Sequence, residues 1–412
     1  MSEEASGLHG NVRWRERRAA EARRVGLRAG DGFWYRAGEL LIGADVEDEL
    51  ADLVEDSRGR PDFTGNYQLA RLGLGIRRWL LPRSTDIPAL VARLREQYID
   101  RPGGPPLVAP NVGFSGEPFY DGGPGDFPRP APELPFLPRT SPPTGPAHLA
   151  VMDTGVPALL RSWHADLADS LRPDDDDVDA LDLDGDGVLD FQAGHGTFIC
   201  GLVRRIAPQL VIDPEQVLDS FGFGSDLGLA RALVTSCAPV LNLSLGGYSE
   251  QDQPPPATAA ALRVLRMRRP EVVVVAAAGN HGDVRPFWPA AFEDFLAVAA
   301  IDTTGSSAVA AAFSNYGTWV NLCAPGVDLQ APYVRGRRQD ENGGGPTDFI
   351  GWASWSGTSF AAPLVAAAIA ARVANGGYGP NVVTQMLASL NPLPGYPNHG
   401  RFFDPGTNLR VS

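Results

Sequence analysis

The sequence contains no lysine, so arginine supplies all 35 of its basic side chains. Acidic side chains are more numerous, at 49, and the formal net charge is -14 at pH 7. A strongly acidic chain is repelled by phosphate backbones and anionic lipids, so this charge argues against nucleic acid and membrane surfaces as partners. We interpret the missing lysine as codon bias toward a GC-rich genome.

Cysteine is also scarce. The chain has three, Cys200, Cys237 and Cys323, and an odd, sparse set does not form a disulfide framework. Long hydrophobic runs are absent as well, because 272–278 and 361–371 fall short of the ~18–20 residues that span a bilayer. The N-terminus carries charge where a secretory signal needs an apolar core. We therefore expect a protein of the reducing cytoplasm without a membrane segment.

The length of 412 residues suits one large and one small domain, at ~100–200 residues per domain. Hydrophobic residues make up 43% of the chain, enough to bury a core. Residues 1–30 form a basic N-terminal segment with seven arginines and four glutamates. A solvated segment, either a short helix or a loose tail, is the preferred interpretation.

Residues 31–114 predict a small α+β domain, in which apolar residues recur first with strand and then with helix periodicity. The expected elements are a strand at 38–43, a helix at 46–54, two strands or one bent strand within 67–82, a helix around 87–94 and a strand within 106–112. The order β-α-β-β-α-β is the ferredoxin-like arrangement.

Residues 115–146 are rich in proline and glycine, which predict an extended linker that wraps a surface. Over residues 147–412, short valine-rich apolar runs alternate with helical stretches. Continuous apolar runs are typical of strands buried on both faces of a parallel sheet. This part therefore predicts an α/β domain with a mostly parallel central sheet and active residues at the carboxyl ends of its strands.

Four polar residues stand where such a fold places its chemistry: Asp153, His195, Asn280 and Ser359. The aspartate and the asparagine follow apolar runs, the histidine lies between two glycines, and the serine opens a helix of small residues. Each also has a plain structural interpretation, as a turn or capping residue, a core histidine or an N-cap serine.

Together, these residues and their surroundings resemble the subtilisin-like serine proteases, the subtilases of peptidase family S8. Their order along the chain includes the Asp, His, Ser order of a subtilisin. The matching stretches lie within about 150–375 and read VMDTGV, GHGTFICG, LNLSLGG, VVVVAAAGN, FSNYGTWVNLCAPG and SGTSFAAP. The resemblance implies a subtilisin-like three-layer fold for 147–412 and the hydrolysis of peptide bonds.

The resemblance also implies a role for each of the four. Ser359 would be the nucleophile, His195 its general base and later its acid, and Asp153 the group that orients and stabilises the imidazole. Asn280 would donate its side-chain amide to the oxyanion, together with the backbone N–H of Ser359.

A protein or peptide substrate is then expected to bind as an added strand between two edges of a cleft. One edge would consist of Ser244, Leu245 and Gly246, and the other of Gly222, Phe223 and Gly224. The pocket for the residue before the cut bond would be lined by Ala278, Gly279, Phe287 and Trp288. The two bulky rings predict a shallow, apolar pocket.

Many subtilases carry an N-terminal ferredoxin-like propeptide that assists folding and inhibits the enzyme. Residues 38–112 match such a unit in size, element order and position, so intramolecular inhibition is an expectation. A permanent accessory domain is the alternative, because a long proline-rich linker intervenes.

Two stretches depart from the pattern of the family. Phe198, Ile199 and Cys200 stand where His, Val and Ala are more frequent, and Cys200 is expected to be a small buried hydrophobe. Residues 333–355 resemble an inserted loop that leads to the nucleophile and shapes the cleft.

A run with nine aspartates occupies residues 174–190. Asp182, Asp184, Asp186 and Asp190 stand at positions 1, 3, 5 and 9 of a calcium loop that begins D-x-D-x-D-G. Position 12 is Ala193, so a last ligand would come from Asp177 or Asp179. A structural calcium ion is one interpretation and a solvated acidic loop the other; the scattered cysteines do not suggest zinc, and catalysis requires no cofactor.

The sequence therefore predicts a cytoplasmic serine endopeptidase that makes limited cuts in proteins or peptides. An idle subtilase scaffold that binds an extended peptide is the alternative, and the intact triad argues against it. An esterase is disfavoured by the peptide-binding edges around Gly222 and Ser244.

Overall fold

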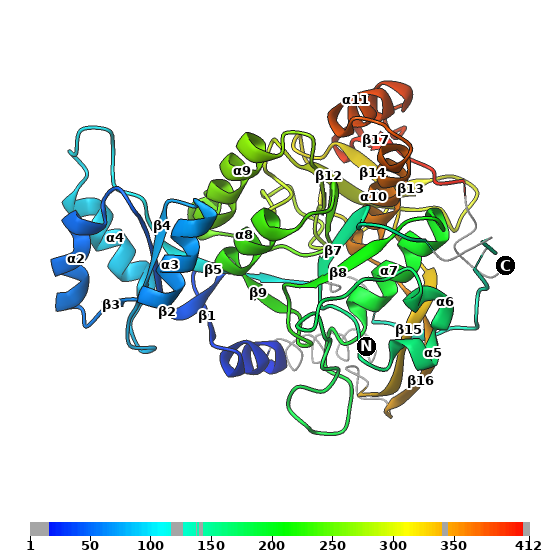
Figure 1. The fold of residues 1–412 in the computed structure, drawn as a ribbon, viewed down its shortest axis with the longest axis horizontal. Helices are drawn as coiled ribbons and strands as arrows, with labels where there is room; N and C mark the ends of the chain where they lie inside the picture. The colour runs from blue at the N-terminus through cyan, green and yellow to red at the C-terminus, as the bar shows by residue number, and fades with distance from the viewer. Residues whose placement is uncertain (1–15, 117–126, 137, 140–142, 340–344, 407–412) are drawn as a thin grey trace, which may run out of the picture.

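The computed structural model describes residues 16–116, 127–136, 138–139, 143–339 and 345–406. A smaller N-terminal unit with an antiparallel sheet lies beside a larger unit with a mostly parallel sheet (Figure 1). No helix among these residues is long and apolar enough to cross a membrane.

The larger unit is built on an eight-stranded sheet in the order β17-β14-β12-β11-β10-β7-β8, with β13 paired to β12. Its strands are β7 (Leu149–Asp153), β8 (Ile212–Gln216), β10 (Val240–Leu243), β11 (Val273–Ala277), β12 (Leu296–Asp302), β13 (Val309–Ala310), β14 (Leu322–Pro325) and β17 (Arg401–Phe402). Neighbours along this order are parallel, and β13 is antiparallel to β12.

Helices cover both faces of this sheet. The longest are α7 (His195–Ile206), α8 (Asp226–Thr235), α9 (Pro256–Arg268), α10 (Thr358–Ala374) and α11 (Gly379–Ser389). In β7, Leu149 and Val151 enter a core with α7 and α10. Ala150 and Met152, which alternate with them, enter a second core with α8 and α9. The predicted three-layer α/β fold with strands buried on both faces is confirmed.

The expected loop at 333–355 is instead a pair of antiparallel strands, so that prediction was wrong. β15 (Leu329–Arg338) pairs with β16 (Thr347–Trp355), and β16 pairs with β6 (Arg129–Pro130) of the linker. Residues 340–344 between the two strands lie outside the described part. Within the described linker residues 127–136, the carbonyl of Leu134 accepts a hydrogen bond of 2.6 Å from Arg205 of α7.

The remaining short elements of the larger unit are α5 (Leu160–Trp163), α6 (Ala165–Ala168), β9 (Phe223–Ser225), η1 (Glu250–Asp252) and η2 (Pro397–His399). The N-terminal unit contains β1 (Leu27–Ala29), β2 (Trp34–Gly43), α2 (Glu47–Asp56), β3 (Arg60–Pro61), α3 (Phe63–Leu72), β4 (Ile76–Leu80), α4 (Ile87–Gln97) and β5 (Val108–Ser115). Its sheet has the order β3-β4-β2-β5-β9, so β9 of the larger unit completes it. In Figure 1 this unit lies beside α8 and α9.

One segment of the N-terminal unit differs from its prediction. Strand was expected within 67–82, but the chain is helical up to Leu72 and extended only in β4. The Asp62 side chain caps this helix by accepting from the N–H of Gly65, and Gly73 ends it with a left-handed φ of 81°. These two capping signals prevail over the apolar alternation. The helix α3 therefore separates β3 from β4. The expected β-α-β-β-α-β order has no helix at that point.

The described part of the basic N-terminal segment, residues 16–30, is docked in part and not simply solvated, and residues 1–15 lie outside the described part. Residues 16–24 are helical, and within them Arg18 and Ala22 are buried. Arginine stems can cover apolar surface while their charged ends find partners, so charge alone did not reveal this burial.

Candidate active site

The ends of three neighbouring strands bring the predicted polar residues together. β10 lies between β7 and β11. Asp153 ends β7, Ser244 follows β10, and Asn280 follows β11. In a parallel sheet these carboxyl ends meet at one edge. His195 begins α7 and Ser359 lies in the first turn of α10, so both helices start at this edge.

Asp153 and His195 form a buried pair. The Nδ1 atom of His195 lies 2.8 Å from Oδ1 and 2.9 Å from Oδ2 of Asp153, and both side chains are fully buried. A ring nitrogen facing a carboxylate carries the proton, so Nε2 is the acceptor. Nε2 is buried and has no hydrogen-bond partner among the described residues. The pair therefore leaves His195 Nε2 as an acceptor that no described residue uses.

Packing holds the imidazole from two sides. The ring centroids of Trp355 and Phe360 lie 5.3 Å and 5.4 Å from that of His195. On the helix side, a Cβ at Gly196 would lie 2.4 Å from the carbonyl oxygen of Gly155, so only glycine fits. The motif GHG thus reflects this close approach, and the β15–β16 hairpin supplies one wall.

Asp179 contacts the chain neighbours of both members of the Asp153–His195 pair. Its Oδ2 accepts from the N–H of Gly194 at 2.7 Å and from the hydroxyl of Thr154 at 3.2 Å. Burial, together with the nearby charge of Asp153, raises the pKa of Asp179 to about 7. From the sequence Asp179 was predicted only as a calcium ligand, because its place in an aspartate run gave no other signal.

Ser359 and Ser244 are linked by two hydrogen bonds. The Oγ of Ser359 donates to the carbonyl of Ser244 at 3.3 Å, and the Oγ of Ser244 donates to the carbonyl of Ser359 at 2.7 Å. Asn242 donates to the same Ser244 hydroxyl at 2.9 Å. These bonds fix the start of α10 against one expected edge of the cleft.

Asn280 is oriented by Thr358, a residue that the sequence analysis missed. The Oδ1 of Asn280 accepts from both the N–H and the hydroxyl of Thr358, each at 2.8 Å. The Thr358 hydroxyl accepts in turn from the N–H of Gly279 at 3.0 Å. The two bonds to its oxygen fix the orientation of the Asn280 carboxamide.

The two expected cleft edges are both occupied by the end of β5. Ser115 exchanges two backbone hydrogen bonds with Gly246, at 2.8 Å and 2.9 Å, and Gly116 donates to the carbonyl of Gly222 at 3.0 Å. Just before them, Phe114 pairs with Gly224 in the β5–β9 ladder. The N-terminal unit thus inserts an extended strand in the place predicted for a peptide substrate.

The residues predicted to line a specificity pocket separate into two groups. The Phe287 ring lies between Gly246 and Gly279, where a Cβ on either glycine would come within 3 Å of it. By contrast, the Trp288 ring packs on Phe292 inside a core, with centroids 4.7 Å apart. Ala278 and Leu245 also belong to cores. Phe287 therefore forms a cleft wall, whereas Trp288 contributes its backbone, which pairs with Gly247.

The acidic loop contains two clusters. Carboxylate oxygens of Asp182, Asp184 and Asp190 lie within 4.8 Å of one another, and Asp174, Asp176 and Asp177 form a second group with the same spacing. Neither Asp186 nor Asp179 belongs to the first cluster, so the predicted four-ligand set is reduced to three.

An arginine side chain already pairs with the first cluster. Arg24, from the docked N-terminal helix, forms an ion pair with Asp184. Asp190 is buried and accepts from the hydroxyl of Ser220 and the N–H of Leu183. Burial raises the pKa of Asp190 to about 6, and the charges of the neighbouring aspartates add to this.

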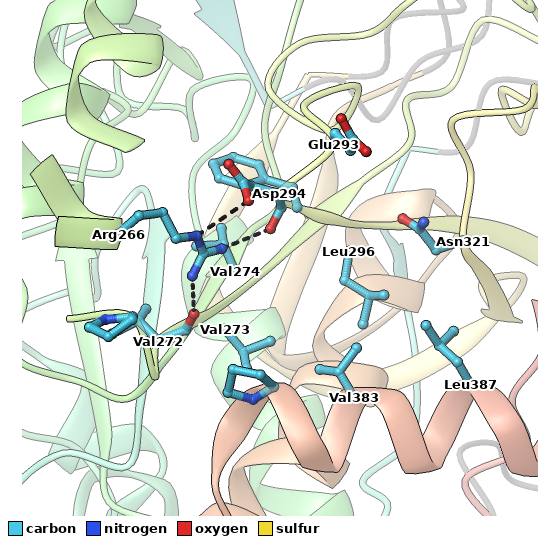
Figure 2. A pocket seen from close by; sticks show the side chains of 13 residues that line it. Arg266, Val272, Val273, Val274, Glu293, Asp294, Leu296, Asn321, Val383 and Leu387 are labelled. Carbon is cyan, nitrogen blue, oxygen red and sulfur yellow. Dashed lines mark hydrogen bonds and ion pairs between the residues drawn. The ribbon is translucent and has the colours of Figure 1, made fainter. Parts of the chain in front are cut away.

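Two other features lie outside the cleft chemistry. Cys200 is fully buried in the core beside α10, as expected, and burial raises the pKa of its thiol. A cavity of about 400 Å³ lies where β11 and β12 begin, at the opposite edge of the sheet from Asn280. Figure 2 shows Val383 and Leu387 pointing toward Leu296, with the Arg266 guanidinium on the far side beside Asp294, and the lining includes none of Asp153, His195 and Ser359.

Comparison with known proteins agrees with this geometry. The model of the subtilase family matches residues 147–389. A thermophilic serine proteinase from Bacillus sp. (strain AK1) is 34% identical over 231 residues, which are 53% of this chain and 50% of that protein. Thermitase from Thermoactinomyces vulgaris is 32% identical over 234 residues, which are 53% of this chain and 72% of its own.

The fold similarity extends beyond the peptidase part. The crystal structure of fervidolysin from Fervidobacterium pennivorans, described as a keratinolytic enzyme related to subtilisin, superposes over 94% of this chain and 63% of its own, with a TM-score of 0.62 and 19% identity. The present chain spans about half the length of the Bacillus relative. Because the family model covers more than half of the chain, the protein belongs to the subtilase family.

Proposed function

We propose that this chain is a serine endopeptidase that hydrolyses peptide bonds through Asp153, His195 and Ser359. The observation that carries the proposal is the buried Asp153–His195 pair, whose Nε2 atom lacks a partner among the described residues. Ser359 supplies a hydroxyl at the start of α10, where backbone N–H groups favour a developing negative charge.

The proposed reaction uses these groups in the following order. The Ser359 hydroxyl first breaks its hydrogen bond to the Ser244 carbonyl. It then gives its proton to His195 Nε2 while Oγ attacks the substrate carbonyl. Asp153 stabilises the imidazolium while Asn280 and the Ser359 N–H donate to the oxyanion. His195 then protonates the leaving amine, and a water molecule releases the acyl group by the same two steps.

A fluorophosphonate probe tests this function, because it reacts with an activated serine hydroxyl. We expect one modified peptide, containing Ser359, in the wild-type chain and none in Ser359→Ala. If Ser359 still fails to label after the N-terminal unit has left the cleft, a peptide-binding scaffold is favoured instead.

We further propose that the N-terminal unit inhibits the peptidase from within the chain. The β5 strand supports this, since Ser115 and Gly116 use the backbone groups that a substrate strand would need. Ser359 is only 2% exposed and His195 is fully buried. This burial, together with the occupied cleft edges, supports a closed form that a substrate opens by displacing β5.

A second contact holds the unit in place. The guanidinium of Arg18 lies 4.2 Å from the ring centroid of Phe191 and 4.0 Å from that of Phe223. It also donates to the carbonyl of Phe221 at 2.6 Å and pairs with Glu21 at 3.0 Å. Phe223 belongs to the strand that pairs with β5, so the helix secures the same cleft edge.

Intact-mass analysis of the wild-type chain beside Ser359→Ala tests whether this inhibition is relieved by processing. Loss of a front segment from the wild type alone would support both activity and self-cleavage. If neither chain is cut, yet the wild type labels slowly with the probe, the unit acts as a permanent inhibitory domain.

We propose a structural calcium ion at Asp182, Asp184 and Asp190. The three carboxylates fit a hard cation in spacing and charge, but Arg24 now pairs with one of them. Calcium binding would therefore displace Arg24 and would stabilise the loop that leads to α7.

The reducing cytoplasm remains our proposed compartment. All three cysteines are unpaired, and two of them are buried. Fractionation of cells that produce the full chain tests this, and recovery of the chain from the medium would refute it.

A further inference from the structure

The extended segment that lies between the two cleft edges has a glycine, Gly116, where it packs against Gln192 and Leu218. Gly116 donates to the carbonyl of Gly222, and its own carbonyl accepts from the side-chain amide of Gln192. Gln192 stands three residues before His195 and was not singled out from the sequence. It is fully buried and its backbone N–H donates to Ser220 at 2.8 Å.

Little room exists for a side chain at this position. A Cβ on Gly116 would lie 3.0 Å from Leu218 Cδ1 and 3.5 Å from the amide carbon of Gln192. A carbon contact of 3.0 Å is well inside the usual ~3.5–4.0 Å separation. Alanine therefore requires a shift of a few tenths of an ångström, and a longer side chain must push one of the two walls aside.

Neither wall can move easily. Leu218 is packed in the core with α8, and it also closes on Gly224, where a Cβ would lie 2.9 Å from Leu218 Cδ2. Gln192 covers Gly222, where a Cβ would lie 2.1 Å from its Cγ. Displacing either side chain would disturb β9 or the approach to α7, and overpacking a filled site is unfavourable.

We propose that Gln192 and Leu218 make this subsite selective for glycine, so that the substrates are extended peptides with glycine at the position that Gly116 occupies. Gln192 acts as a positioning residue, because its amide binds the carbonyl of that glycine. Leu218 sets the size limit. This inference rests on the proposed peptidase function for the identity of the ligand, but the shape of the subsite can be tested without catalysis.

The first test uses the full chain in the inactive Ser359→Ala form. We expect Gly116→Leu to expel the strand, so that backbone amides of residues 113–116 and 223–225 exchange at least tenfold faster. Adding Leu218→Ala should restore slow exchange, because it opens the wall. Gly305→Leu is the matched control, since a Cβ there would meet nothing within 4 Å. Unchanged protection in Gly116→Leu would overturn the proposal.

The second test uses the active chain and a peptide library read by mass spectrometry. We expect glycine at one fixed position on the amino side of the cut bond, with kcat/KM about 10- to 100-fold lower for leucine there. Leu218→Ala should raise the rate for alanine and leucine peptides, whereas Leu262→Ala, in the same core but on α9, should not.

The outcomes of the two tests separate the two proposals. Cleavage without a glycine preference refutes the selective subsite and leaves the peptidase intact. Absence of both cleavage and Ser359 labelling refutes the peptidase, while the exchange experiment still decides whether the subsite excludes side chains.

Discussion

Replacing Arg18 with alanine should open the active site. The substitution removes a guanidinium that stacks on Phe191 and Phe223 and donates to the Phe221 carbonyl. Arg18 is only 8% exposed, so its partners would lose these contacts with little solvent to replace them. A charged hydrogen bond contributes ~1.5–3 kcal/mol and a cation–π contact ~0.5–2 kcal/mol. We take about 2–3 kcal/mol of docking free energy, which corresponds to a factor of about 30 to 150.

The rate of fluorophosphonate labelling measures this change. Labelling of a nearly inaccessible serine follows the population of the open form when opening and closing are fast. We expect Arg18→Ala to label Ser359 at least tenfold faster than the wild type. Arg18→Lys should give an intermediate rate, because lysine keeps the charge but lacks the planar fork.

Arg23→Ala provides the matched control. Arg23 lies in the same helix as Arg18, but it is exposed. The unfolding temperature of each variant shows whether the peptidase part remains folded. If Arg18→Ala labels no faster than Arg23→Ala while both are folded, the helix does not hold the cleft closed and our reasoning is refuted.

Three further predictions concern the site and its surroundings. Asn280→Ala should lower kcat by about 10²–10³-fold, the loss known for an oxyanion asparagine of a subtilisin, with a much smaller change in KM; equal changes in both would exclude the oxyanion role. Because the pKa of Asp179 is raised from 3.8 to about 7, the unfolded chain loses its proton first and stability falls as pH rises between these values, by an amount on the order of 4 kcal/mol. Urea unfolding in the Ser359→Ala chain should show this loss, and adding Asp179→Asn should remove it; parallel pH profiles would contradict the assignment. Calcium at 100 times its Kd should stabilise the chain by about 2.7 kcal/mol, and Arg24→Ala should reach this gain at a lower calcium concentration. Asp184→Asn should abolish the gain without preventing labelling of Ser359. If a chelator changes the thermal unfolding of neither the wild type nor the two variants, the calcium site is refuted.

Parts of the fold could be predicted because their signals are local. The valine-rich runs of β7 and β11 follow from burial on both faces, and small residues before α10 follow from close packing at its start. The helix α3 was mistaken for strand, since an apolar alternation was given more weight than the caps Asp62 and Gly73. The hairpin β15–β16 was taken for a loop, although residues along β16 alternate between buried and exposed.

The acidic run shows why spacing alone was insufficient. Four aspartates match a calcium loop in sequence, yet Asp186 binds the N–H of Val188 and stands outside the cluster. Asp179 instead accepts from the N–H of Gly194, next to His195. All these residues carry the same kind of side chain, and the path of the backbone separates their contacts.

The sequence by itself determined which polar residues to consider: an aspartate and an asparagine that follow buried strands, and a histidine and a serine that open helices of small residues. Only the tertiary structure decided what fills the cleft and what holds it there. Ser115 and Gly116 pair through backbone N–H and carbonyl groups, which every residue possesses, so no side-chain signal marks them. Arg18 likewise looks like any exposed arginine until folding brings two distant phenylalanine rings to either side of it.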